Sequence, residues 1–423
     1  MHTAALYNTN PRSGVTLVVT MCLMLLGCLA VGSVMSSVLT RTKIAFSQVC
    51  LEQAFYVASA GAEYAATYVA NGNDSATTLS ADFGNGRYTV DVDVSIGADG
   101  ERNFDITSVG TVNNVSRRVV LRGIRRVSWA RYAMWYDSEA TKLWIVPGER
   151  FDGRFYSRPQ LHFHNNDLAT KGQARFTDKA WTAAATIEKA SSAVNPIFEQ
   201  GLTTSAAIDS MASVNFPSLL TKANSGGLVL NGATTIVLNG TTMKVTNSRA
   251  GWSNKTVAVP ANGLVYVKTA TTGTSSTKTG DLKISAPSGF NGRASFVADH
   301  DILVTDHVLY ANDPQTDPGS TDAIGLIAKR NVAVQTSAPN NLEIFAHIIA
   351  QTGGFGVDSY NSGSSRGVLT VYGGIVNSIR NAVGIVGGSG YTKNYIFDRR
   401  FATNPPPNYP TVTDELEWSE WEG

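Results

Sequence analysis

The sequence predicts a mainly β protein with one long N-terminal α-helix, and three observations support this fold class. Residues 15–40 contain no charged side chain. Apolar and polar residues then alternate strictly in the region 86–126, as in strands with one buried face. After Tyr132, many short apolar runs are separated by Gly and Asn. At 423 residues the chain is too long for one ordinary core, so we expect two or three globular units beyond the helix.

The composition narrows the possible functions. Charged residues make up 16% of the chain and the net charge is +1, with Lys and Arg scattered along the sequence. A continuous basic face for nucleic acid is therefore not indicated. All three cysteines, Cys22, Cys28 and Cys50, lie in the first fifty residues. We expect the rest of the chain to fold without a disulfide framework or a thiolate metal site.

The N-terminal segment is predicted to be one continuous helix over 15–70. The uncharged run is long enough to cross a hydrocarbon core of ~30 Å. Past Arg41 and Lys43, apolar residues recur at spacings of three and four, and the Asn71-Gly72 pair supplies a helix stop. The small residues in this stripe permit close helix packing. The stripe consists of Leu51, Phe55, Ala58, Ala62, Ala65 and Val69.

Two other interpretations compete for the same segment. A secretory signal would be short and cleaved near small residues, whereas this apolar pattern continues into an amphipathic helix. The run Leu25-Leu26-Gly27-Cys28 resembles a bacterial lipobox, which would place a lipid on Cys28. The continuing apolar residues favour a spanning helix over both alternatives.

The N-terminus resembles that of minor pilins of the PilX type. The resemblance is carried by Arg12-Ser13-Gly14, by the uncharged run that begins at Val15, and by the segment 53–63, QAFYVASAGAE. It implies insertion with the N-terminus inside, cleavage by prepilin peptidase between Gly14 and Val15, and packing with other pilin-like subunits through the helix. The location it implies is the bacterial inner membrane before assembly and the pilus or cell surface afterwards.

The sequence departs from the pattern of major pilins at two positions. Val15 replaces the usual Phe or Met, and Val19 stands where a Glu is expected. In the family, that Glu pairs with the N-terminal amine of a neighbouring subunit, and a charge in lipid is tolerable mainly when paired. We therefore hypothesise a subunit at a filament tip or in an accessory complex rather than a bulk subunit.

We expect the exterior to begin with a small antiparallel sheet over 71–131, lying on the second half of the helix. Residues 132–404 are predicted to form a β-helix-like solenoid, with a β-sandwich as the alternative and a partly helical insertion at 176–223. Parts of this region loosely resemble an uncharacterised β-helical domain of bacterial surface proteins, which implies fold more than activity. Residues 1–14 are leader-like, and 405–423 form a proline-led acidic tail.

Several side chains resemble ligand or catalytic groups, but simpler structural roles are favoured for all of them. His162 and His164 would share one face of a strand, a spacing that can hold a metal ion. The pairs His300-Asp301 and Asp306-His307 flank a short apolar run and fit outward-facing corners of a coil equally well. The remaining group lies in a turn rich in Gly and Pro and consists of Asp313, Asp317 and Asp322. We predict no metal site, no cofactor and no catalytic residue.

Three function classes follow from these observations. The first is a structural subunit of a type IV pilus-like or secretion machine. The second is a membrane-anchored adhesin that contacts surface glycan, with exposed aromatics such as Trp252 and Tyr360 as candidates. The third is a polysaccharide-active β-helix enzyme, which would need a clustered carboxylate pair. We expect a non-enzymatic protein that combines the first role with display of its exterior for adhesion or assembly.

Overall fold

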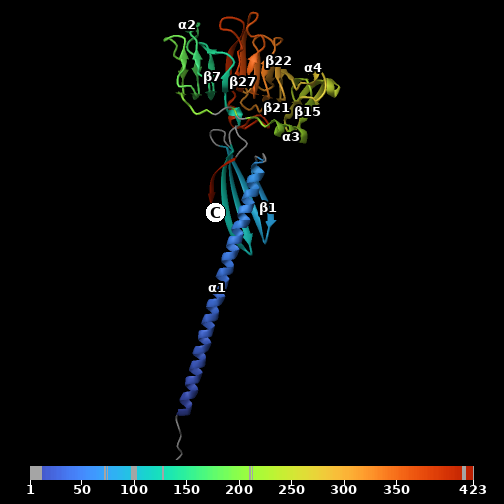
Figure 1. Cartoon of the computed structure of the whole chain (residues 1–423). Coiled ribbons are helices and arrows are strands. Elements are labelled where there is room, and N and C mark those ends of the chain that lie inside the picture. Colours follow the sequence, from blue (N-terminus) through green and yellow to red (C-terminus); the bar gives the residue numbers. More distant parts are fainter. Residues whose placement is uncertain are drawn as a thin grey trace, which may run out of the picture. The chain divides into compact units, whose positions relative to one another are not determined.

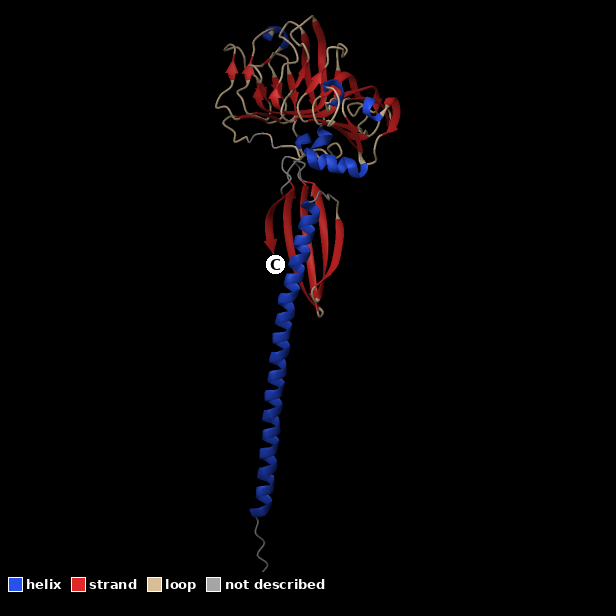
Figure 2. Cartoon of the chain, turned by 45° about the vertical axis from the view of Figure 1, so that its right-hand side comes forward, coloured by secondary structure: helices blue, strands red, loops and turns tan. Residues whose placement is uncertain are grey.

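The computed structural model describes residues 12–70, 73, 75–96, 102–125, 128–208, 211, 213–411 and 416–422. The chain folds into two compact units, which are described separately. Unit 1 comprises residues 1–95, 103–124 and 417–423, and unit 2 comprises 96–102 and 125–416. Figures 1 and 2 show one long helix and an otherwise strand-rich chain, which confirms the predicted fold class.

Unit 1 consists of the helix α1 (Arg12–Ala70) and one sheet that packs on it. The sheet contains β1 (Thr77–Phe83), β2 (Gly86–Ile96), β3 (Arg102–Val112) and β4 (Val115–Arg125), in that order. The predicted alternation is confirmed in β2, where Tyr88, Val90 and Val92 are buried and the residues between them are exposed. A fifth strand, β29 (Leu416–Glu422), pairs with β4. Unit 2 is therefore inserted between two neighbouring strands of the unit 1 sheet.

Strand β3 approaches the backbone of α1 very closely at Gly110. A Cβ atom at this position would lie 2.3 Å from the carbonyl oxygen of Ala54 and 2.4 Å from the backbone nitrogen of Ala58. Backbone atoms cannot move aside as a flexible side chain can, so only glycine fits here. The helix contributes small residues to the same contact, since Ala54, Ala58 and Ala62 are fully buried. Small residues on both sides thus set the short distance between helix and sheet.

Unit 2 is a solenoid-like coil whose strands stack in parallel. The first stack runs, in spatial order, through ten strands: β15 (Leu228–Asn231), β19 (Leu264–Lys268), β21 (Arg293–Ala298), β23 (Ala323–Ala328), β25 (Glu343–Ala350), β27 (Ser365–Arg380), β5 (Met134–Glu139), β8 (Phe155–Ser157), β11 (Ala180–Thr182) and β14 (Leu202–Thr203). This parallel register excludes the β-sandwich alternative, whose sheets are antiparallel.

Two further parallel stacks complete the coil. The second contains β16 (Thr234–Asn239), β20 (Leu282–Phe290), β22 (Ile302–Tyr310), β24 (Val332–Val334) and β26 (Phe355–Val357). Parts of β20, β22, β25 and β27 continue into the third, which proceeds through β28 (Gly390–Phe397), β7 (Arg150–Asp152), β10 (Arg175–Phe176) and β13 (Ile197–Phe198).

Smaller elements are added to the coil. β6 (Trp144–Ile145), β9 (His162–Phe163) and β12 (Glu188–Lys189) form a separate parallel sheet. β17 (Thr242–Asn247) and β18 (Trp252–Ala258) extend β16 in antiparallel fashion. The short helices are α2 (Leu168–Lys171), α3 (Phe216–Gly226) and α4 (Ser275–Lys278), with 3-10 turns at Trp129–Arg131, Ser248–Ala250 and Arg399–Ala402.

Inward-facing side chains in register build the core as columns. Phe151, Phe176 and Phe198 are direct partners in β7, β10 and β13, and their rings stack with centroids 5.0 and 4.7 Å apart. Aliphatic residues form the equivalent column in the second stack, including Ile236 and Ile284, which are fully buried. Because each turn of the coil places an apolar residue over the last, burial stabilises the stack without a strict sequence period.

The chain enters the coil in its middle and not at an end. Its first strand, β5, pairs with β27, which comes last in the chain among the strands of the first stack. In the same way, β7 pairs with β28. We call these two pairings the joint. From the joint the chain winds to β14 at one end of the stack, crosses over, and resumes with β15 at the other end. The remaining strands then wind back to the joint.

We expected a partly helical insertion at 176–223. In the structure, the first part of this segment belongs to the coil, and the rest is part of a crossover that connects β14 to β15. Residues 175–203 supply strands of the coil, and the helical part is limited to α3. The crossover is fixed along the coil, because the backbone nitrogens of Met211 and Val214 donate to Asp137 Oδ2 and Gln351 Oε1, both at 2.7 Å. The Ala-rich composition of 176–223 suggested helix, but Ala180 is buried in β11 and alanines 183–185 lie in the bend after it.

The two ends of unit 2 lie side by side. The backbone nitrogen of Trp129 donates to the carbonyl oxygen of Pro410 at 3.0 Å. His347 in β25 holds the same two segments from inside, because Nδ1 lies 2.6 Å from the hydroxyl of Tyr409 and Nε2 lies 3.0 Å from the carbonyl oxygen of Tyr132. Residues 405–411 of the expected tail therefore belong to unit 2, and β29 belongs to the sheet of unit 1.

The burial of His347 leads us to predict that the protein loses stability in acid. Burial lowers the pKa of His347 to about 3, against a usual value of 6.5. Between these pKa values the unfolded chain binds a proton at this group that the folded chain does not. The contribution of His347 to the free energy of unfolding is therefore fully present above pH 6.5. Below pH 6.5 it falls by about 1.4 kcal/mol per pH unit. We expect H347Q to be less stable at pH 7 but to lose stability less steeply between pH 6.5 and 4, as measured by urea unfolding. Equal slopes for both proteins would contradict this role.

Candidate assembly helix and candidate ligand sites

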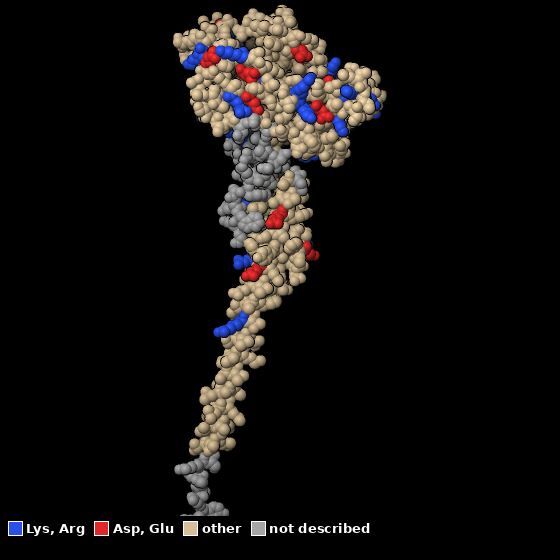
Figure 3. Space-filling view, viewed as in Figure 1, with Lys and Arg blue, Asp and Glu red and all other residues tan. Residues whose placement is uncertain are grey.

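The N-terminal half of α1 is apolar and uncovered. Every side chain from Val15 to Val49 is exposed, and among the described residues α1 is the one helix long and apolar enough to cross a membrane. The most apolar window of this helix has a mean hydropathy of 2.5. Figure 3 shows a long stretch of the rod as uncharged surface, with one basic spot above it; the charged residues in this half are Arg41 and Lys43. An apolar surface of this length is stable only when lipid or other protein surrounds it.

Four hydroxyl groups in this half, those of Thr20, Ser33, Thr40 and Thr42, bond to carbonyl oxygens of the helix itself. Ser33 Oγ donates to the carbonyl oxygen of Ala30 at 2.8 Å, and Thr40 Oγ1 donates to that of Ser36 at 2.8 Å. Thr20 bonds back to Thr16 in the same way. Such bonds lower the cost of moving a hydroxyl into an environment without water. The whole segment is thus suited to a bilayer or to a bundle of apolar helices.

The stripe singled out in the sequence lies on the other half of α1 and faces the sheet of its own unit. Ala58, Ala62, Ala65 and Val69 are fully buried there, and Leu51 and Phe55 are partly buried. Sequence reasoning missed Ala54, Val57 and Gly61, which share this buried face. The stripe is therefore occupied within the chain, and the uncovered half of α1 is residues 15–49.

The residues at the predicted cleavage site are only partly described. Residues 1–11 of the leader-like segment lie outside the described residues, and the helix begins at Arg12. Gly14 lies in the first turn of α1. Val15 and Val19 are exposed on the helix. Cys28, the candidate for acylation, also lies exposed within the unbroken helix.

The two alternating histidines have partners other than a metal. Nδ1 of His162 lies 2.8 Å from Glu188 Oε2 in the neighbouring strand. The ring of Trp144 contacts both His162 and His164, with centroids 5.8 and 5.3 Å away. His164 accepts a hydrogen bond from the backbone of Asn166. In the described part of the chain, neither histidine belongs to a group of three metal-ligating side chains.

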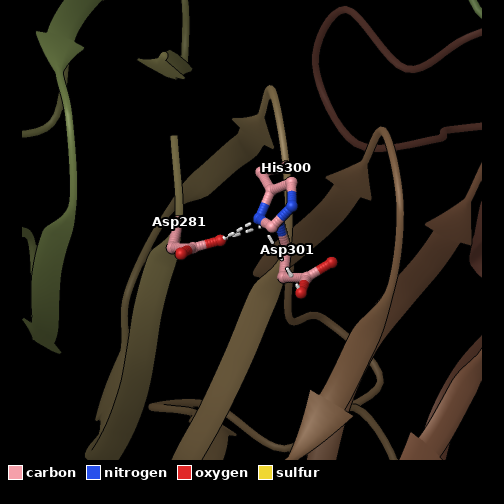
Figure 4. A group of neighbouring side chains, drawn as sticks. All are labelled: Asp281, His300 and Asp301. Carbon is pink, nitrogen blue, oxygen red and sulfur yellow. Dashed lines mark hydrogen bonds and ion pairs between the residues drawn. The ribbon is translucent and has the colours of Figure 1, made fainter. Parts of the chain in front are cut away.

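A second cluster combines His300 and Asp301 with Asp281, as Figure 4 shows. The sequence analysis did not find Asp281, which comes from the adjacent turn of the coil, where Leu282 pairs with Ile302. Nδ1 of His300 lies 2.5 Å from Asp281 Oδ1. Asp306 and His307 do not join this group, because His307 Nδ1 accepts from the backbone of Glu343.

Protein donors already occupy the carboxylate of Asp301. Arg330 Nε donates to it at 2.8 Å and the backbone nitrogen of Asn331 at 3.0 Å. Burial alone would raise the pKa of Asp301, but the hydrogen bonds from Arg330 and Asn331 outweigh it and lower the pKa. A metal ion would have to displace the guanidinium, so the cluster is better described as a structural ion-pair network at a corner of the coil.

The three carboxylates considered for catalysis stabilise turns. Asp322 is buried and accepts from the backbone nitrogens of Gly292 and Asn312. Asp313 and Asp317 accept from backbone groups two residues ahead of them, as is usual in turns. None of these contacts presents a pair of carboxylates to a cleft. Trp252, suggested for ligand contact, is partly buried, with Lys255 Nζ 4.2 Å from its ring centroid.

Charged pairs that the sequence analysis did not predict lie buried at the joint. Arg380 Nη1 lies 2.9 Å from Glu139 Oε1, and Lys393 Nζ lies 2.8 Å from Glu149 Oε1. Each pair joins residues more than 200 positions apart in the sequence. Burial lowers the pKa of Lys393, with Glu149 opposing that shift. Only the fold brings these residues together, so no local sequence signal marks them.

Comparisons with known proteins add little at the level of sequence. No protein-family model matches the chain, and no curated protein matches it. A solved structure that matches is that of the competence-associated pilin ComZ from Thermus thermophilus. The match has a TM-score of 0.32 and 12% identity, and it covers 88% of this chain and 97% of that one. A likeness at this level carries no argument of its own, and the functional case depends on the helix and the coil.

Proposed function

We propose that this chain is a non-catalytic, pilin-like minor subunit that assembles through the uncovered half of α1 and displays the coil of unit 2. The observation that carries the proposal is the division of one helix into two halves. Residues 15–49 are exposed and, apart from Arg41 and Lys43, uncharged, whereas the buried face between Cys50 and Val69 is covered by the sheet of the same unit. A bilayer before assembly and a bundle of similar helices afterwards would both cover the exposed half.

The finer parts of the proposal follow from the N-terminal residues. Prepilin peptidase is the proposed processing partner, with cleavage between Gly14 and Val15, and the inner membrane followed by the pilus or cell surface is the proposed location. Val19 offers no charge to pair with the amine of a neighbouring subunit, which supports a position at a tip or in an accessory complex. A role in adhesion is proposed for unit 2, with surface glycan as a partner.

Processing is tested by the mature N-terminus of the chain from its native membrane. We expect mass spectrometry to find a methylated N-terminal Val15 and to find the chain in sheared surface filaments. G14L should block cleavage and keep the chain in the membrane, while the matched control S13A should be processed normally. An acylated Cys28, or a start beyond residue 30, would contradict the proposal in favour of a lipoprotein or a secreted protein.

The proposed position in a filament is tested by V19E. A carboxylate at this position can pair with the N-terminal amine of a neighbouring subunit, so we expect V19E to spread from the tip or accessory position into the shaft, as seen by immunogold labelling. V18E places the same charge on another side of the helix and serves as the control. If V19E is distributed like the unchanged chain, the lack of a glutamate does not set the position.

A further inference from the structure

A cavity of about 250 Å³ lies at the joint of the coil, within unit 2. Its wall includes residues 141–144 after β5, residues of β27 and the segment after it up to Val386, the loop that carries Tyr360, and Lys393 and Tyr395 of β28. It lies apart from the Asp281, His300 and Asp301 cluster. Tyr360, one of the aromatics suggested above for glycan contact, lies in its lining.

The charged side chains that line the cavity all have the same sign. They are Lys142, Arg380 and Lys393, and no carboxylate is among the lining residues. The compensating carboxylates are not among the lining residues. Glu139 binds Arg380, Glu149 binds Lys393, and Glu188 binds Lys142. Both oxygens of Glu149 face the one ammonium group, at 2.8 and 3.1 Å. Since an ammonium group has three hydrogens, Lys393 retains a donor for a ligand.

The rim of the cavity is apolar and aromatic. Ile385 and Val386 are 48% and 41% exposed, and Trp144 and Tyr360 stand beside them with half-buried rings. The rim is formed without a ligand, because Ile385 N donates to the carbonyl oxygen of Ser389 at 2.8 Å, and Ser389 Oγ donates to that of Tyr360 at 2.9 Å. A preformed concave site with an apolar rim and a few convergent polar groups is typical of small-molecule binding.

Asn377 adds an unsatisfied polar group to the wall. The side chain is 1% exposed, and its Oδ1 has no hydrogen-bond partner among the described residues. Most buried polar atoms in native proteins are paired, and an exception calls for an explanation. Because this oxygen is shut off from solvent, a hydroxyl group of a bound molecule would reach it only after the surrounding side chains moved.

We propose that the cavity binds one carboxylated sugar unit, of the uronic acid type. The carboxylate would face Lys393 and Arg380, and the apolar face of the ring would lie against Trp144 and Ile385. The volume is below the range of roughly 300–1,000 Å³ usual for larger ligands, which limits the occupant to a single unit. The inference does not require the chain to be a pilin.

The test is titration of the full chain in detergent with D-glucuronate, D-glucose and acetate, followed by calorimetry. We expect saturable binding of glucuronate, and binding at least about tenfold weaker for glucose, which lacks the charge, and for acetate, which lacks the ring. Equal binding of glucose would overturn the role of the basic wall. Equal binding of acetate would overturn the sugar specificity, and no binding of glucuronate would overturn the site.

Two variants at the rim locate the site without disturbing the buried pairs. I385E adds a negative charge beside the cavity and should weaken glucuronate binding by about tenfold or more. I385Q is its matched control and should bind with little change, because the side chain is exposed and remains uncharged. Equal affinity of I385E and I385Q for glucuronate would place the binding elsewhere and overturn the proposal.

Discussion

The structure depends on a single constraint, the need to remove the exposed half of α1 from water. Eighteen large apolar side chains between Val15 and Val49 are exposed. At about 1.5–3 kcal/mol for each side chain that is fully buried, their transfer out of water is worth tens of kcal/mol. No local rearrangement of the chain can supply that burial, because the sheet of unit 1 covers only the later half of the helix. The helix must therefore be completed by lipid or by other subunits.

Close packing in unit 1 keeps the sheet on the later half of α1, so the earlier half stays exposed. The buried stripe of small residues and Gly110 bring the sheet against the backbone of α1, so the sheet stays on the later half. The insertion of unit 2 between β4 and β29 then requires both of its ends to lie together. A coil that started at one end and finished at the other would separate them. Because the chain enters and leaves the coil near the joint, the two ends of unit 2 lie together. The hydrogen bond from the backbone nitrogen of Trp129 to the carbonyl oxygen of Pro410 connects them.

The parts of the fold that depend on local pattern could be predicted from the sequence. The uncharged run predicted the apolar, exposed half of α1, and the helical stripe and the alternation in β2 predicted residues that the structure buries. The path of unit 2 could not be predicted, because the partners at the joint are distant in sequence and short strands such as Ala180–Thr182 lie in Ala-rich surroundings that suggested helix. For the same reason Asp281 and the pair of Lys393 with Glu149 were not foreseen.

The most direct measurement is cysteine labelling along α1 in intact membranes and filaments, using single cysteines placed in a chain without its native ones. A water-soluble maleimide should label positions 56 and 64, where Tyr56 and Tyr64 are exposed beside the unit 1 sheet. Positions 23, 29 and 35 should stay unlabelled until detergent is added, because lipid or neighbouring helices surround them. Equal labelling of all five positions before detergent would show that the apolar half is not buried, and it would contradict a role for this helix in membrane anchoring and assembly.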